Sequence, residues 1–332
     1  MKKEQQELQS LCVLGIFKES FKLILTCPKI FFQISLFLLL PLSFIFLANF
    51  HISQLIFFNI LHNQTFLHQF PQNSQSCALL SDILFSQWIS FFLLKFAYFT
   101  FLLTLSLLST SAVVFTVASI YASSNVTFRK VMSVVSKVWS TLLITFNWNT
   151  AIVFAYNVFS GLLFIFCLSV IGIDDSLGLV IGGILLALYL IGFVYITIVW
   201  HLASVISVLE GSYGKEATIK GKKLIKGKTG TSIVVSSVIL LFFLGIQLGF
   251  ETFVVIGLVA EELRIGVAIL CLMGLLMVIL LGLVVQTVLY FVCKSYHHEH
   301  IAKSSLADHL EAYLGDYVPL RPRDIQIPEI PV

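Results

Sequence analysis

Residues 177–207 read LGLVIGGILLALYLIGFVYITIVWHLASVIS and contain no Asp, Glu, Lys or Arg. A helix that is apolar on every face is buried, either in a large protein core or in a membrane. About 20 apolar residues in a helix are enough to cross the roughly 30 Å hydrocarbon core of a bilayer. This stretch therefore predicts a transmembrane helix, and it sets the class of fold for the rest of the chain.

Five further apolar stretches lie before and after it in the chain. They cover residues 30–50, 88–118, 148–172, 232–258 and 265–292. The chain as a whole is 58% hydrophobic and 11% charged, whereas soluble domains carry about 25% charged residues. The composition excludes a soluble domain, and the apolar stretches predict an all-α integral membrane protein with six transmembrane helices.

The basic residues lie almost entirely on one side of the membrane that these six spans define. Of the 20 Lys and Arg residues, 18 lie before span 1, between spans 2 and 3, between spans 4 and 5, or after span 6; the exceptions are Lys95 and Arg264. Because cytosolic loops are enriched in Lys and Arg, this distribution predicts that both termini are cytosolic. A basic cytosolic face attracts anionic lipids. No basic patch lies in a domain of its own, so we expect the lipid bilayer, and not nucleic acid, as a partner.

Basic amphipathic stretches precede spans 1, 3 and 5. They cover residues 11–26, 127–142 and 217–228, and apolar residues recur in them every three or four positions among Lys and Arg. This spacing is typical of a helix that lies in the headgroup plane. The candidate contacts to anionic lipids are Arg129, Lys130, Lys137, Lys220, Lys222, Lys223 and Lys226. An internal repeat and the ordinary composition of cytosolic connectors explain the threefold pattern equally well.

The spans divide the chain into three parts. Residues 1–29 are expected to form a cytosolic N-terminus with an amphipathic helix, residues 30–292 the membrane domain, and residues 293–332 a cytosolic tail. Within the membrane domain, residues 51–87 contain no Lys or Arg. We therefore expect a long loop there, on the lumenal or extracellular side.

Short motifs agree with this topology. Asn63-Gln64-Thr65 is an N-glycosylation sequon in the loop assigned to the lumenal side, so Asn63 is a candidate glycosylation site. A second sequon at Asn125 falls on the cytosolic side, where it should stay unmodified. Tyr317 and Leu320 in the tail fit a tyrosine-based sorting signal. We expect a protein of the plasma membrane or endomembrane system whose tail binds a protein partner.

Charged side chains inside a span are candidates for a functional site, because burying them in hydrocarbon is costly. Lys95 lies a few residues inside the outer end of span 2, and Glu251 lies at a similar depth in span 5. One hypothesis is a polar pair between them across the bundle. The alternative for Lys95 is that its ammonium reaches the outer interface while its methylene chain stays in the apolar layer.

Sequence patterns of catalytic and metal sites are not visible. The chain has no Gly-rich phosphate loop, nucleophile elbow or Cys-x-x-Cys. The run His297-His298-Glu299-His300 lacks the His-Glu-x-x-His spacing of zinc proteases. We therefore expect no enzyme activity, no cofactor and no metal.

Parts of the second half resemble a plant family of uncharacterised six-span transmembrane proteins. The similar residues are 208–214 (VLEGSYG), Ala217 with the lysine-rich residues 222–227, and, in the tail, 293–297 (CKSYH) and 313–320 (YLGDYVPL). The resemblance covers most of the chain and is sharpest after span 4. It implies a polytopic protein of the endomembrane system or plasma membrane, and it brings no established catalytic residues.

The leading hypothesis for function is a non-enzymatic protein that organises membranes, acts as a scaffold or takes part in trafficking. Its lysine-rich cytosolic helices would contact anionic lipids, and its tail would bind a protein partner. The alternative is a transporter or channel for a small solute or lipid, based on Lys95, Glu251 and the glycine-rich spans.

Overall fold

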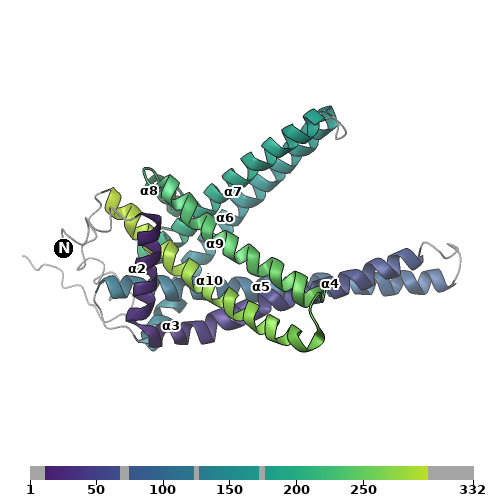
Figure 1. Cartoon of the computed structure of the whole chain (residues 1–332), viewed down its shortest axis with the longest axis horizontal. Helices are drawn as coiled ribbons and strands as arrows, with labels where there is room; N and C mark the ends of the chain where they lie inside the picture. Colours follow the sequence, from purple (N-terminus) through teal and green to yellow (C-terminus); the bar gives the residue numbers. More distant parts are fainter. Residues whose placement is uncertain (1–11, 68–74, 123–126, 172–175, 298–332) are drawn as a thin grey trace, which may run out of the picture.

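The computed structural model describes residues 12–67, 75–122, 127–171 and 176–297, and all regular secondary structure in these ranges is helical (Figure 1). The long helices follow one another as three hairpins. Short helices lie before the first hairpin and between the second and the third.

The first hairpin consists of α4 (Leu40–Leu67) and α5 (Gln75–Tyr121). The helices α2 (Val13–Thr26) and α3 (Pro28–Ile34) lead into it through the π-helical turn η1 (Ser35–Leu39). In this turn the backbone N–H of Leu40 donates to Ser35 O, five residues earlier. Pro41 follows directly, and because proline has no N–H and its ring crowds the carbonyl four residues before it, the regular α-helical pattern is interrupted there.

The second hairpin consists of α6 (Phe128–Ile171) and α7 (Ser176–Leu209). The short helix α8 (Lys215–Leu224) then connects it to the third hairpin. That hairpin consists of α9 (Thr229–Phe250), which continues into the π-helical turn η2 (Glu251–Val255), and of α10 (Glu261–Tyr296).

Six helical segments of the described part are long and apolar enough to cross a membrane. They are Pro28–Thr65, Ser81–Tyr121, Phe128–Cys167, Val180–Leu209, Thr229–Val255 and Glu261–Tyr296. Each contains most or all of one of the six spans expected from hydropathy. The all-helical class is confirmed for the described residues, and the architecture is compatible with an integral membrane protein.

The three hairpins diverge from a common base, where α2, α3 and α8 also lie (Figure 1). Helix α10 is central to this base, since it contacts α2, α5, α7 and α9. Residues 284–293 of α10 are buried without interruption, as expected of a helix that other helices surround. The largest hydrophobic core of the described residues lies here and takes side chains from all three hairpins.

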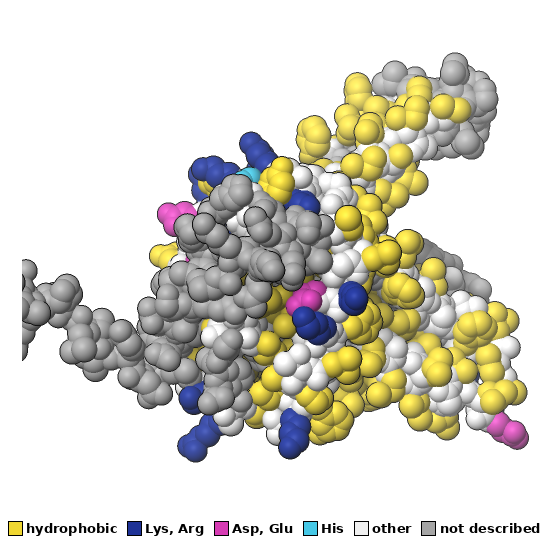
Figure 2. Space-filling view, turned by 60° about the vertical axis from the view of Figure 1, so that its left-hand side comes forward, with side chains coloured by type: hydrophobic (Ala, Val, Ile, Leu, Met, Phe, Trp, Pro, Cys, Tyr) yellow, Lys and Arg dark blue, Asp and Glu magenta, His cyan; other side chains and the backbone are white. Residues whose placement is uncertain are grey.

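Away from the base, the hairpins expose large apolar side chains. Phe159, Phe166 and Ile191 of the second hairpin are each more than 60% exposed. Figure 2 shows such side chains, in yellow, over the projecting parts of the molecule. A soluble protein rarely exposes apolar surface of this extent, whereas lipid tails cover it in a membrane.

The expectation of a long loop at residues 51–87 is wrong for most of its length. Helix α4 continues to Leu67 and α5 begins at Gln75. Residues 51–67 contain neither Gly nor Pro and are rich in Phe, Ile and Leu. The first span is already long enough for a bilayer at residue 50, but no helix-breaking residue follows there, so the helix continues. The absence of Lys and Arg predicts a side of the membrane, but it does not predict a loop.

The three basic stretches are mostly helical where the structure describes them, although residues 225–228 lie outside α8, and they are not three equivalent helices. α2 and α8 are separate, whereas residues 128–142 form the first part of α6 and run into its apolar part without a break. No Gly or Pro lies between residues 128 and 160, so nothing in the sequence interrupts this helix. A position of these stretches in the headgroup plane stays a prediction.

Candidate functional site

Glu210 is the first carboxylate after the apolar length of α7, and it lies at the end of that helix. Its backbone N–H donates to Ile206 O at 2.8 Å and so completes the last helical turn. Gly211 and Gly214 follow with φ values of 67° and 60°, which glycine adopts at little cost because it has no Cβ. The chain therefore turns sharply, and α8 returns toward the carboxylate that ends α7.

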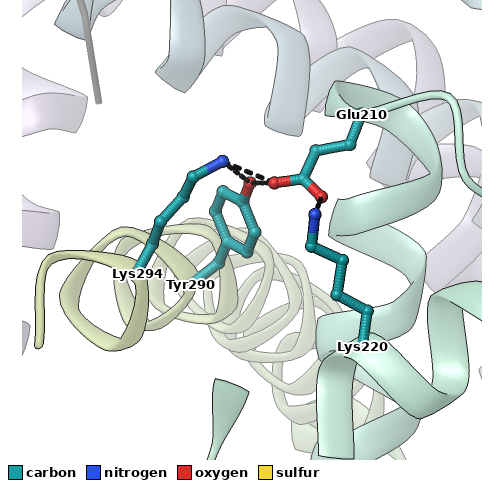
Figure 3. A network of polar contacts seen from close by, with 4 residues as sticks. All are labelled: Glu210, Lys220, Tyr290 and Lys294. Carbon is teal, nitrogen blue, oxygen red and sulfur yellow. Dashed lines mark hydrogen bonds and ion pairs between the residues drawn. The ribbon is translucent and has the colours of Figure 1, made fainter. Parts of the chain in front are cut away.

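The Glu210 carboxylate binds side chains from two other helices (Figure 3). Its Oε1 accepts hydrogen bonds from Tyr290 Oη and from Lys294 Nζ of α10, each at 2.5 Å. Its Oε2 lies 2.6 Å from Lys220 Nζ of α8. Tyr290 and Lys294 are four residues apart on a helix and thus lie on one face, where Lys294 Nζ also donates to Tyr290 Oη at 3.1 Å. We call these four side chains the Glu210 cluster.

The Glu210 cluster is partly withdrawn from solvent. The side chains of Glu210 and Lys294 are 13% and 19% exposed, and that of Lys220 is 41% exposed. Burial alone would raise the pKa of Glu210, but the hydrogen bonds from Lys220, Lys294 and Tyr290 outweigh it and hold the pKa below its ordinary value. The carboxylate is therefore ionised at neutral pH, and two ammonium groups share it.

A second group of hydrogen bonds holds the turn before α8 against α6 and α7. Thr145 Oγ1 and Ser207 Oγ lie 2.7 Å apart, and the backbone N–H of Gly214 donates to Thr145 Oγ1 at 2.8 Å. Thr218 Oγ1 of α8 donates to Asn149 Oδ1 of α6 at 3.0 Å. The first part of the connection between the second and third hairpins is thus fixed to α6 and α7 by polar contacts.

Close packing fixes the apolar face of α8. Ala217 is fully buried and Leu224 is 4% exposed. A Cβ atom placed on Gly221 would lie 3.3 Å from Val199 O and 3.4 Å from Ala203 N, both backbone atoms of α7. These contacts would be tighter than usual and backbone atoms do not move aside easily, so glycine favours the close approach of α8 to α7.

The opposite face of α8 carries exposed lysines. Lys222, Lys223 and Lys226 are exposed, while Lys220 is drawn toward Glu210. The candidate lipid contacts in the first part of α6 are exposed as well; they are Arg129, Lys130 and Lys137. Figure 2 shows Lys and Arg side chains, in dark blue, around the base from which the hairpins diverge. Among the predicted lipid contacts, Lys220 forms an internal ion pair with Glu210.

Two open grooves lie beside α8. The first, of about 580 Å³, is lined by Glu216, Ile219, Lys220, Lys223, Leu224 and His297. The second, of about 570 Å³, lies at the start of α8 and has Trp148 and Tyr213 in its wall. His297 Nε2 lies 3.1 Å from Leu224 O, which fixes the imidazole at one end of the first groove.

The predicted pair of Lys95 with Glu251 is not formed. Lys95 Nζ lies 2.5 Å from Ser53 Oγ and 3.3 Å from Asn49 Oδ1, both on α4. Its ammonium is also 5.4 Å from the centre of the Phe91 ring. Helix α5 packs on its hairpin partner α4, whereas Glu251 begins η2, which packs on α9 and α10. The partners of Lys95 thus come from its own hairpin, and the two charged residues that suggested a transporter do not form a pair.

The remaining predicted sites are placed as follows. Asn63 lies in α4 and its amide donates to Gln87 Oε1 of α5 at 3.1 Å. Tyr317 and Leu320 lie outside the described residues, as do His298, Glu299 and His300. Within the described ranges, no group of three or more His, Cys, Asp or Glu side chains is arranged to hold a metal ion.

Sequence reasoning did not find the Glu210 cluster. Glu210, Lys220 and Tyr290 are up to 80 residues apart, and only the turn at Gly211 and Gly214 brings the first two together. The sequence does contain one signal. Glu210 is the first carboxylate after the charge-free residues 177–207, and the lysines of residues 215–228 follow it. A carboxylate in that position has to be paired if it is buried.

In the part of the chain that the structure describes, fold and site together define an all-helical protein with six helices long and apolar enough to span a membrane and a charged cluster where three helices meet. The chain belongs to the family described as domain of unknown function (DUF8558), whose model matches residues 1–330. No curated protein and no solved structure matches the chain.

Proposed function

We propose that this protein organises a membrane without catalysing a reaction, and that its basic face binds anionic lipids. The supporting observation is the fixed position of α8. Ala217, Gly221 and Leu224 attach its apolar side to the base, while Lys222 and Lys223 point away from it. Each Lys or Arg near an anionic membrane surface contributes about 1 kcal/mol of attraction.

The fixed backbone strengthens this proposal. A disordered lysine segment loses conformational freedom when it binds, and that loss weakens binding. The hydrogen bond from Thr218 to Asn149 and the ion pair between Lys220 and Glu210 order α8 before any lipid arrives. Lysines on an ordered helix therefore lose less conformational entropy when they bind anionic headgroups than lysines on a disordered segment do.

The proposal includes a topology and a location. Because α8 directly follows one apolar helix and precedes another, it would lie at the end of both spans, at headgroup depth. With both termini in the cytosol, α8 would face the anionic cytosolic leaflet of the plasma membrane or the endomembrane system. We also propose that the family consists of plant six-span proteins, and that Tyr317 and Leu320 bind a trafficking partner.

The experiment is native mass spectrometry of the full chain in detergent micelles titrated with phosphatidylserine or phosphatidylcholine. The wild type should retain phosphatidylserine in preference to phosphatidylcholine. Changing Lys222, Lys223 and Lys226 together to Gln should remove most of this preference. The control changes the same three residues to Arg, which keeps the charge and should keep the preference.

Two results would contradict the proposal. Equal retention of both lipids by the wild type would show that its basic face does not select charge. A preference that survives the triple Gln substitution would place lipid selection elsewhere in the molecule.

A further inference from the structure

The first groove beside α8 combines features of a ligand site with features of a membrane surface. Its volume of about 580 Å³ lies within the range of about 300–1,000 Å³ that small-molecule sites occupy. Lys220 and Lys223 supply ammonium groups to its wall, and Glu216 supplies a carboxylate. A bare phosphate would fill only a small part of this space.

The mixed charges of the wall restrict the chemistry of the ligand. Lys223 favours an anion such as a phosphate, which accepts hydrogen bonds from ammonium groups, whereas the Lys220 ammonium is already paired with Glu210. The Glu216 carboxylate would repel that anion, but it accepts hydrogen bonds from hydroxyl groups. A ligand that carries both a phosphate and several hydroxyls satisfies both kinds of side chain, and an inositol ring with a phosphate is such a group.

The rim of the groove indicates that the ligand is part of a lipid. Ile219 lines the groove and is 44% exposed, although it is a large apolar residue. Tyr296, which precedes the groove residue His297 in the sequence, is 40% exposed, and Lys228 Nζ lies 5.8 Å from the centre of its ring. An exposed aromatic ring beside a lysine is typical of the bilayer interface, and so is an exposed isoleucine. A soluble phosphate ester has no apolar part that would cover Ile219, whereas a lipid has acyl chains that could.

The Glu210 cluster holds one wall of the groove in place. Lys220 Nζ lies 2.6 Å from Glu210 Oε2, so the direction of this side chain is set from inside the base (Figure 3). The imidazole of His297, which also lines the groove, is held by its contact with Leu224 O. Two of the residues that line the groove, Lys220 of α8 and His297 just after α10, are thus already positioned.

We infer that this groove binds the phosphorylated inositol headgroup of a membrane lipid, with Lys223 on the phosphate and Glu216 on the ring hydroxyls. The inference rests on the proposed binding of anionic lipids and names the lipid class that the site takes. The other lysines of α8 then serve only as a general attraction for anionic headgroups.

Helix α8 provides a matched pair of variants for the test. Lys223 lines the groove. The neighbouring residue Lys222 has the same charge and is also exposed, but it does not line the groove. Native mass spectrometry of the full chain in micelles would measure the retention of phosphatidylinositol 4-phosphate, phosphatidic acid and phosphatidylserine. Lys223→Gln should weaken binding of phosphatidylinositol 4-phosphate about tenfold, the effect of one charge-assisted hydrogen bond, and Lys222→Gln less than threefold. Glu216→Ala should weaken the binding of phosphatidylinositol 4-phosphate but not the binding of phosphatidic acid, which has no ring hydroxyls.

The outcomes separate the groove from the general proposal. Equal losses of phosphatidylinositol 4-phosphate binding in Lys222→Gln and Lys223→Gln would overturn the assignment of the groove as the lipid site, while the proposal of anionic-lipid binding would stand. No retention of any anionic lipid by the wild type would overturn both. Soluble inositol 1,4-bisphosphate serves as a competitor: binding as tight as that of the lipid would overturn the assignment to a membrane ligand, whereas much weaker binding supports it.

Discussion

Glu210 at the end of α7 and Lys294 near the end of α10 form an ion pair at 2.5 Å across 84 residues of sequence. Their side chains are 13% and 19% exposed, so the pair joins the second and third hairpins inside the base. Glu210→Ala would leave the Lys294 ammonium withdrawn from water without its carboxylate. We expect the free energy of unfolding to fall by about 2–4 kcal/mol, since breaking a largely buried pair costs more than breaking an exposed one.

The measurement is thermal unfolding of the full chain in detergent, followed by tryptophan fluorescence. Glu216→Gln is the control, because Glu216 is exposed and begins the neighbouring helix α8. It should change stability by only a few tenths of a kcal/mol, as expected for a charge near an exposed helix start. Equal unfolding temperatures for Glu210→Ala and the wild type would show that the cluster does not hold the hairpins together.

The pH dependence of stability should carry the signature of the same carboxylate. The pKa of Glu210 in the folded protein lies below its ordinary value of 4.5, so the folded state favours the ionised form. Its contribution is complete above the pKa of the unfolded chain and is lost as the pH falls through the lowered folded-state pKa. The difference in unfolding temperature between the wild type and Glu210→Gln should therefore be constant from pH 7 to about 5.5 and shrink below about pH 4. If the difference in unfolding temperature grew on acidification, the pKa of Glu210 would be raised in the folded protein and not lowered.

The close approach of α8 to α7 makes a second prediction about stability. A Cβ atom on residue 221 would lie 3.3 Å from a backbone oxygen and 3.4 Å from a backbone nitrogen, neither of which can rotate away. We expect Gly221→Ala to lower the free energy of unfolding by about 1–3 kcal/mol, the usual cost of overpacking. Gly230→Ala is the matched control, because nothing lies within 4 Å of the added carbon there. That variant should be neutral or slightly more stable, since alanine favours helix.

Much of the fold could be predicted from the sequence, because hydrophobic length alone specifies a membrane span. The six apolar helices are an example, since a charge-free run such as residues 177–207 has few alternatives. Helix ends were predicted less well. Residues 51–67 remain helical because they contain no Gly or Pro, and no hydropathy rule locates a helix end in such a segment.

Polar partners could not be predicted from depth alone. Lys95 and Glu251 were paired because both lie near the outer ends of their spans, yet Lys95 contacts Asn49 and Ser53 on the adjacent helix α4. Amide and hydroxyl oxygens accept hydrogen bonds from an ammonium, and here such groups are available on the adjacent helix. The Glu210 cluster depends in the same way on which faces of α7, α8 and α10 meet.

A double-mutant cycle would test the new partners of Lys95. Lys95→Met and Asn49→Leu should be coupled by about 0.5–1.5 kcal/mol, because each removes the hydrogen bond that the other residue needs. Lys95→Met and Glu251→Gln should be additive within about 0.5 kcal/mol, as for sites without shared contacts. Unfolding temperatures of the single and double variants give both values. Strong coupling to Glu251 would restore the polar pair and the transport hypothesis.

Glycosylation of Asn63 would test the topology on which the lipid proposals depend. The Asn63 amide that would carry a glycan donates to Gln87 Oε1, so the sugar has to be added before α4 and α5 close into a hairpin. We expect a glycosidase-sensitive form of the protein in eukaryotic cells that Asn63→Gln abolishes. Asn125→Gln should change nothing, because that sequon is assigned to the cytosolic side. A glycan on Asn125 would invert the topology, place the lysines of α8 away from the anionic cytosolic leaflet, and remove the basis of the lipid proposals.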